Sequence, residues 1–177
     1  MKETRFIEND GGRSKYFSGR GGDCVARSVA IASGKDYLEV YNRLAEGNSK
    51  QRAGKSSAHK VGKKTALHGI NVKRKWFKEY MKELGFEWVP TMKVGSGCTT
   101  HLCSSELPAG RLVLALSRHY TAMIDGVIHD TYNPGRWDSR SDDGSSLKSN
   151  EFVLPGDNNK GLVFIEKRCV YGYWIKK

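Results

Sequence analysis

The stretch Gly21-Gly22-Asp23-Cys24-Val25-Ala26-Arg27-Ser28-Val29-Ala30-Ile31-Ala32 decides how this chain begins to fold. Its glycines predict a loop, and the small and apolar residues after them predict a helix over 24–33 that ends at Gly34. Asp23 takes the N-cap position, so Cys24 is the first helical residue. Unpaired N–H groups and the helix dipole favour a thiolate there, although the Asp23 carboxylate opposes the dipole. The alternative is a small buried cysteine that starts an ordinary core helix.

Length and composition point to one globular domain over residues 1–177. Hydrophobic residues make up 38% and charged residues 28% of the chain, and no apolar run is long enough to cross a bilayer. The polar N-terminus lacks the apolar core of a signal peptide. We therefore expect a cytoplasmic protein without a membrane partner. Its four cysteines are expected to be reduced, and their spacing indicates no disulfide framework.

The positive charge of the chain is concentrated in one segment. The formal net charge is +11, and residues 50–78 hold ten Lys or Arg and no Asp or Glu. Such a segment is able to bind nucleic acid or another polyanion. The alternative is a solvated face, which is favoured by the absence of aromatic residues before Trp76. The candidate contacts with nucleic acid are Lys60, Lys63, Lys64, Lys73, Arg74 and Lys75.

Hydrophobic periodicity places helices in the first half of the chain and strands in the second. Residues 1–22 are glycine-rich and predict irregular structure. Helices are predicted over 35–45, closed by Gly47, and over 73–84, with a basic loop over 48–72 between them. Strands are predicted over 86–93, 111–116, 119–124, 127–132, 162–165 and 169–175, with a polar excursion over 133–160. This order predicts an α+β fold in which N-terminal helices pack on a C-terminal antiparallel sheet.

The dipeptide Asp125-Gly126 is the strongest hairpin signal in the sequence. A two-residue turn there pairs Ile124 with Val127 and, further along, places Thr121 opposite residue 130. His119 and Asp130 then lie on one face as diagonal neighbours, roughly 7–8 Å apart at the backbone. Asp130 is therefore able to accept from one nitrogen of the imidazole while the other nitrogen faces a thiol.

Cys24, His119 and Asp130 together make a nucleophile, a base and a group that orients the base. In such a site the backbone N–H of Cys24 donates to an oxyanion. A side-chain donor usually stands beside it, and Asn9, Ser18 and Arg20 are the candidates. The remaining candidates for oxyanion or substrate contacts are Asp23, Asn133 and Trp137. Asn133 orients the histidine only if the strand bulges or ends early, and Trp137 either walls a substrate cleft or covers the core.

At these residues the chain resembles papain-like cysteine peptidases, and most closely their bacteriocin-leader (double-glycine) peptidase branch. The matching segments are Asp23-Cys24 at a helix start, 119–124 with its leading histidine, and Ile128-His-Asp130. The resemblance implies a papain-like fold and hydrolysis of a peptide or isopeptide bond through an acyl-enzyme, with Cys24 as nucleophile, His119 as base and Asp130 as orienter. The family's glutamine before the cysteine is missing, since the chain has Ser18, Gly19 and Arg20 there and its only glutamine is Gln51.

The chain is also similar to uncharacterised proteins of tailed bacteriophages over 95–102, 125–131 and 169–174. For a phage protein, the location is the host cytoplasm or the virion. The competing hypothesis is a catalytically inactive papain-like fold that binds nucleic acid or a protein through its basic segment. In the peptidase hypothesis the partner is a protein or peptide substrate.

The segment Cys98-Thr-Thr-His101-Leu-Cys103 holds two thiols and an imidazole within six residues. A zinc site requires a fourth ligand and usually a C-x-x-C pair, so the sequence predicts no metal and no cofactor. Cys98 is an alternative nucleophile, but no predicted helix follows it. His59 and His68 are expected to be solvated, and His129 is expected to face away from Asp130.

Overall fold

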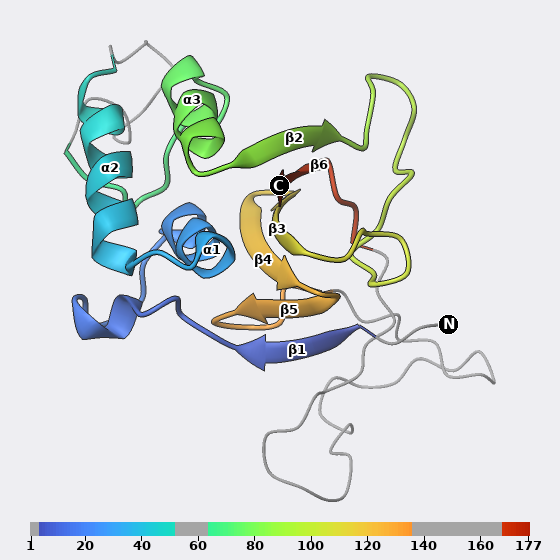
Figure 1. Ribbon diagram of the computed structural model, residues 1–177, viewed down its shortest axis with the longest axis horizontal. Helices are drawn as coiled ribbons and strands as arrows, with labels where there is room; N and C mark the ends of the chain where they lie inside the picture. The colour runs from blue at the N-terminus through green and yellow to red at the C-terminus, as the bar shows by residue number, and fades with distance from the viewer. Residues whose placement is uncertain (1–3, 52–63, 136–167) are drawn as a thin grey trace, which may run out of the picture.

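The computed structural model describes residues 4–51, 64–135 and 168–177. Within these ranges, helices α1 (Cys24–Ser33), α2 (Tyr37–Ser49) and α3 (Lys75–Glu83) lie on one side of a six-stranded sheet (Figure 1). The strands are β1 (Arg5–Glu8), β2 (Phe86–Pro90), β3 (Arg111–Leu116), β4 (His119–Ile124), β5 (Val127–Asp130) and β6 (Gly172–Lys176). The predicted α+β class is confirmed at this level.

The sheet differs from the predicted antiparallel sheet at one edge. Its strand order is β1-β5-β4-β3-β6-β2, and β1 pairs with β5 in parallel, with Phe6 opposite Ile128. The prediction of irregular structure over 1–22 is therefore wrong for β1 and for a 3-10 helix, Arg13–Lys15. A four-residue edge strand carries little periodicity, and its partner is more than a hundred residues away, so no local pattern announces it.

The β4–β5 hairpin has the predicted register. Ile124 pairs with Val127 and Ala122 with His129. Asp125 and Gly126 both have positive φ, at 48° and 82°, which is the backbone that a two-residue turn of this type requires. β5 ends at Asp130, two residues earlier than predicted.

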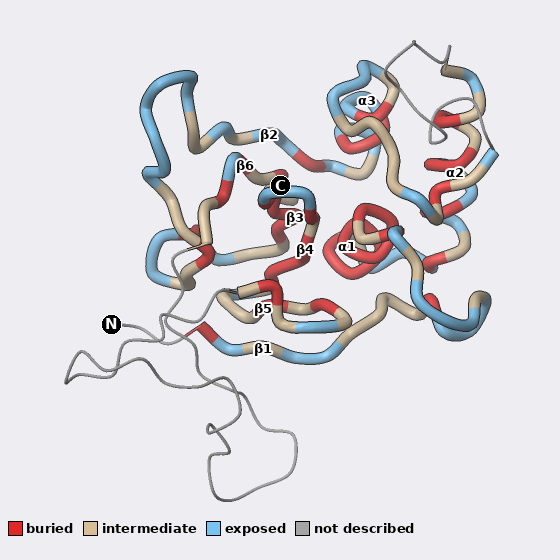
Figure 2. The backbone as a smooth tube through the Cα atoms, turned by 180° about the vertical axis from the view of Figure 1, so that it is seen from behind, coloured by how far each residue is buried: buried red, intermediate tan, exposed pale blue. Residues whose placement is uncertain are grey.

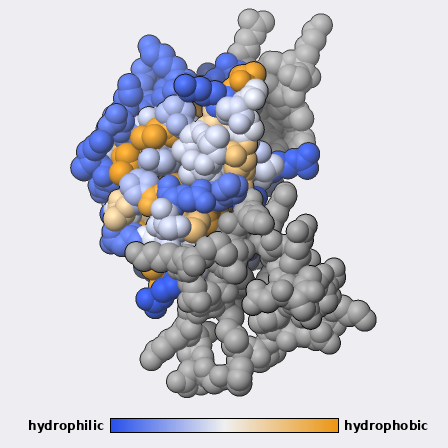
Figure 3. Space-filling view, turned by 90° about the vertical axis from the view of Figure 1, so that its right-hand side faces the viewer, coloured by the Kyte–Doolittle hydropathy of each residue, from blue (hydrophilic) through white to orange (hydrophobic). Residues whose placement is uncertain are grey.

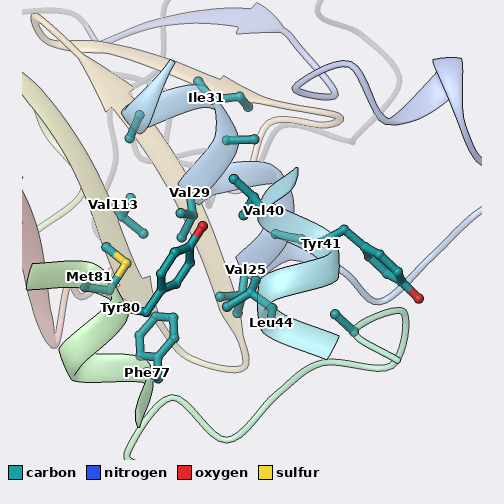
Figure 4. Close-up of a cluster of buried hydrophobic side chains, with 14 of the residues drawn as sticks. Val25, Val29, Ile31, Val40, Tyr41, Leu44, Phe77, Tyr80, Met81 and Val113 are labelled. Carbon is teal, nitrogen blue, oxygen red and sulfur yellow. The ribbon is translucent and has the colours of Figure 1, made fainter. Parts of the chain in front are cut away.

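Helix α1 forms the centre of the larger hydrophobic cluster. Figure 2 shows α1 buried over most of its length, and every residue from Val25 to Ala32 is buried. Figure 4 shows this cluster with its labelled side chains, which are Val25, Val29, Ile31, Val40, Tyr41, Leu44, Phe77, Tyr80, Met81 and Val113. Because α1 has few ways to move within this packing, the residue at its start is held in a fixed place against β4.

A second hydrophobic cluster includes Leu112, Leu114 and Met123 from the central strands and Leu102 and Leu107 from the long connection between β2 and β3. Figure 1 shows this connection on the far side of the sheet from the helices. Cys98 in the connection forms a disulfide with Cys169. The expectation that all four cysteines are reduced is therefore wrong for this pair. The two cysteines are 71 residues apart in the sequence, and no local pattern indicated that their sulfurs meet.

Helix α2 begins and ends later than predicted. The Asp36 side chain accepts from the N–H groups of Leu38 and Glu39, which starts the helix at Tyr37. Gly47 does not close the helix; the ring of Trp76 packs where a Cβ would stand, so this position takes glycine for close packing. The first two residues of the predicted basic loop 48–72 therefore belong to α2. Residues 52–63 of this loop lie outside the described ranges. The segment 162–165 and most of the excursion 133–160 also lie outside them.

Apolar and hydrophilic residues alternate in small groups on the described part of the face in Figure 3. The exposed large hydrophobic residues in the described ranges include Trp88, Val94 and Tyr171. Among the described helices, none combines the length and the apolar character that crossing a membrane requires.

Candidate active site

Cys24 occupies the first position of α1, as the sequence predicted, and lies beside β4. Its thiol is half-buried. Burial acts to raise the pKa of this thiol, but a hydrogen bond and the charge of His119, the N–H of Tyr120 and the charge of Arg27 outweigh it, so that the pKa is lowered. The thiol of Cys24 is thus placed to ionise more readily than an ordinary cysteine.

His119 and Asp130 form the predicted contact across the hairpin. Nε2 of His119 lies 2.6 Å from Oδ2 of Asp130, and both side chains are buried. Burial acts to lower the pKa of His119, but the hydrogen bonds and charges of Asp130 and Cys24 raise it to about 9. The imidazole therefore remains protonated at neutral pH, between a carboxylate on one side and a thiol on the other.

Tyr132 covers the imidazole from the solvent side. Its hydroxyl lies 3.3 Å from Nδ1 of His119, and the two ring centroids are 5.2 Å apart. About half of Tyr132 is exposed, at 52%. Nε2 is occupied by Asp130, so the Nδ1 side is where the imidazole is available for proton transfer.

Asp23 does not have the role that the sequence suggested. It takes the N-cap position, but its side chain accepts no capping hydrogen bond, and it is fully buried, so its carboxylate is not open to a substrate. Its carboxylate instead accepts from Nε of Arg13 at 2.8 Å, from Arg27 and from the hydroxyl of Tyr37. A buried carboxylate needs such partners, and here they use up the acceptor positions that a cap would use.

Two cations compensate the carboxylate that was expected to oppose the helix dipole. Arg13 is 8% and Arg27 6% exposed, and both bind Asp23. Gly21 permits this arrangement, because a Cβ there would stand 2.7 Å from Nη2 of Arg13. The negative charge next to Cys24 is thus neutralised within the fold.

Arg27 also reaches the histidine's partner. Its Nη2 lies 3.8 Å from Oδ1 of Asp130, the oxygen that accepts from the N–H of Thr131 at 2.8 Å. Sequence reasoning missed Arg13 and Arg27 as parts of this site. The spacing of Asp23 and Arg27, four residues apart on a helix, was the one local signal that could have identified the pair.

No hydrogen bond joins the side chains of the other described candidates to His119 or Asp130, although the backbone N–H of Asn9 donates to the carbonyl of Asp130 at 2.8 Å. Asn133 accepts from the N–H of Gly135 in its own turn, and Asp130 takes the orienting contact. The Asn9 amide contacts His129 at 3.3 Å, on the opposite face of the hairpin from Asp130, as expected for His129. Ser18 and Arg20 are exposed. Trp137 lies outside the described ranges.

Four of the six basic candidates fall within the described ranges. Lys64, Lys73, Arg74 and Lys75 are all exposed, and the last three stand at the start of α3. Lys75 pairs with Glu79 at 3.5 Å. His68 is exposed, as expected. Lys60, Lys63 and His59 lie outside the described ranges.

The cysteine-rich segment is not assembled as a metal site in the described ranges. Cys98 is in the disulfide, and the imidazole of His101 contacts the carboxylate of Glu106 at 3.1 Å. The described residues contain no group of three or more His, Cys, Asp or Glu side chains placed to hold a metal ion. The disulfide also removes Cys98 as an alternative nucleophile in this state.

Comparisons with protein-family models, with curated proteins and with solved structures find no match to this chain.

Proposed function

We propose that this chain is a cysteine peptidase, a thiol hydrolase that cleaves a peptide or isopeptide bond through an acyl-enzyme. The observation that carries the proposal is a half-buried thiol at a helix start, whose pKa His119 lowers, together with the imidazole of that histidine held 2.6 Å from a buried carboxylate. A nucleophile, its base and the group that orients the base are the parts that this chemistry needs. The resemblance to papain-like peptidases around Cys24, His119 and Asp130 points the same way.

The reaction follows from the positions of these groups. The Cys24 thiolate attacks the carbonyl carbon and forms a C–S bond, while N–H groups at the start of α1 stabilise the oxyanion. His119 then protonates the amine as the C–N bond breaks, which leaves a thioester. A water molecule, deprotonated by His119, attacks the thioester and releases the acid and the thiol. Asp130 keeps the imidazole oriented throughout and stabilises its positive charge.

Covalent labelling with an epoxysuccinyl peptide, read by intact and peptide mass spectrometry, tests the nucleophile. We expect one adduct, on Cys24, in the wild type and in Cys103→Ala, which removes the other cysteine of the described ranges that is outside the disulfide. The same proteins should cleave a synthetic peptide library, whereas Cys24→Ala and His119→Ala should not. Library cleavage that persists in Cys24→Ala, or equal labelling of Cys103, contradicts the proposal.

The second candidate function is a binding module for a polyanion, which is supported by the exposed basic side chains at the start of α3. Neutralising Lys73, Arg74 and Lys75 together should weaken binding of a fluorescent oligonucleotide and reduce its dependence on salt. Lys35→Gln is the control, because Lys35 is exposed but lies outside the basic segment 50–78. Binding that is unaffected by the triple change, or insensitive to salt, contradicts this function.

A further inference from the structure

Arg27 lies between the two buried carboxylates that flank the candidate site. One nitrogen of its guanidinium, Nη1, binds Asp23 and the other, Nη2, lies 3.8 Å from Asp130. The three side chains are almost fully buried, at 6%, 0% and 3% exposed. Asp23 directly precedes Cys24 on the chain, and Asp130 is bonded to His119, so Arg27 connects the supports of both reacting groups.

The charges of this cluster alternate in space. Arg13 contacts Asp23, Asp23 contacts Arg27, Arg27 reaches Asp130, and Asp130 contacts His119. When Cys24 is a thiolate and His119 an imidazolium, each charge in the sequence faces a charge of the opposite sign. A planar guanidinium with several donors is suited to two carboxylates at once, whereas an ammonium group acts as a single point charge.

We propose that Arg27 is a positioning residue for the Cys24–His119 pair. By holding Asp23 at the start of α1 and Asp130 at the end of β5 on one guanidinium, it fixes the thiol opposite the imidazole and balances the carboxylate next to the thiol. This inference rests on the proposed function, since it assigns to Arg27 the support of the same site.

The other charged and titratable groups around the pair are few within the described ranges. Cys24 interacts with His119, with Arg27 and with the N–H of Tyr120, and burial and the charge of Cys24 raise the pKa of the Tyr120 phenol to about 12. His119 interacts with Asp130, with Cys24 and with the hydroxyl of Tyr132. Burial and the charge of Asp130 raise the pKa of Tyr132, which lies just after β5, and the charge of Arg168 lowers it. Burial raises the pKa of the Cys24 thiol and the charge of Arg27 lowers it, so loss of the guanidinium leaves the thiol harder to ionise.

The test is the rate of Cys24 alkylation by iodoacetamide as a function of pH, measured in the full chain with Cys103→Ser and the disulfide intact. Arg27→Gln should move the midpoint of the profile to higher pH. At one pH unit or more below the wild-type midpoint, alkylation should be roughly three- to tenfold slower, as a rise of half to one pKa unit produces. Arg27→Lys keeps the positive charge but cannot contact both carboxylates. Its midpoint should lie between those of the wild type and Arg27→Gln. Circular dichroism shows that each variant is folded.

Arg111→Gln is the matched control. Arg111 ties the other end of α1 to the sheet by hydrogen bonds to the carbonyls of Ala32 and Ile31, both at 2.7 Å. Arg111→Gln should lower stability but leave the alkylation profile unchanged. If Arg27 had only a structural role, the Arg27 variants would show this same pattern. A lowered wild-type midpoint that neither Arg27 variant moves overturns this inference alone. A wild-type midpoint at the ordinary thiol value of about 8.5 overturns the proposed function with it.

Discussion

The two ends of α1 are both held by arginine, but for different reasons. At the C-terminal end, Arg111 donates to the carbonyls of Ala32 and Ile31, and Lys176 donates to Ser33 at 2.9 Å. Cations there stabilise the negative end of the helix dipole, as in ordinary helices. At the N-terminal end, Arg27 and Arg13 lie where the dipole is already positive and disfavours them. The buried carboxylates supply the opposite charge that those cations need, and loop carbonyls such as that of Gly19, 2.7 Å from Nη1 of Arg13, accept further hydrogen bonds.

This difference separates an end of the helix that contributes to stability from an end that carries the candidate active site. The C-terminal end uses solvent-accessible or half-buried cations and main-chain acceptors. The N-terminal end buries ionised groups, which a protein tolerates only when each charge is paired. The following predictions test the contrast, beginning with the largest expected effect.

Asp23→Asn should destabilise the protein most. It leaves Arg13 and Arg27 buried without their shared carboxylate, and breaking a buried ion pair in this way costs about 3–5 kcal/mol. Urea unfolding followed by fluorescence measures the change. Glu39→Gln is the control, because Glu39 pairs with Lys35 on the exposed face of α2 and should change the free energy of unfolding by less than about 1 kcal/mol. Equal effects of the two changes would contradict the contrast.

The pKa values of the two hairpin histidines should be shifted in opposite directions from the ordinary histidine value. Asp130 and Cys24 raise the pKa of His119 to about 9 despite its burial, whereas burial and the charge of Arg111 lower the pKa of His129. NMR titration of the imidazole protons measures both values. Peptide hydrolysis should also fall above pH about 9, where His119 loses the proton that it gives to the leaving amine, while alkylation of Cys24 should not fall. A His119 midpoint near 6.5 would rule out the ion pair.

Arg111→Gln should reduce stability by about 2 kcal/mol, less than Asp23→Asn. The change removes two hydrogen bonds at the C-terminal end of α1 but leaves no unpaired charge in the core. Chemical unfolding of the variant, run beside that of Asp23→Asn, ranks the two ends. The contrast fails if the loss at Arg111 exceeds the loss at Asp23.

Gly34→Ala should have the smallest effect, about 1 kcal/mol of destabilisation. Gly34 ends α1 with φ at 76°, a left-handed conformation that alanine adopts with strain, and its N–H donates to the carbonyl of Ala30 at 2.9 Å. The thermal midpoint measures the loss. Alkylation of Cys24 should remain at the wild-type rate, and a slower rate would mean that the two ends of the helix are coupled.

The sequence alone determined the bounds of helix α1 and the pair of side chains on the hairpin. The Gly-Asp-Cys start and the Gly34 end placed α1 correctly, and the Asp125-Gly126 turn placed His119 and Asp130 on one face. These predictions succeeded because turn chemistry and periodicity act over a few residues. The contact of Cys24 with His119 was a hypothesis from chemistry and resemblance, since the two residues are far apart in the chain.

Only the tertiary structure decided the partners that come from distant segments. It paired β1 in parallel with β5, joined Cys98 to Cys169, and turned the Asp23 side chain from a helix cap into a buried acceptor for Arg13, Arg27 and Tyr37. The physical reason is that each of these contacts joins groups from segments that only the folded core brings together, and a linear pattern does not show which segments those are. A buried charge in particular is stabilised by the partners that the core places beside it.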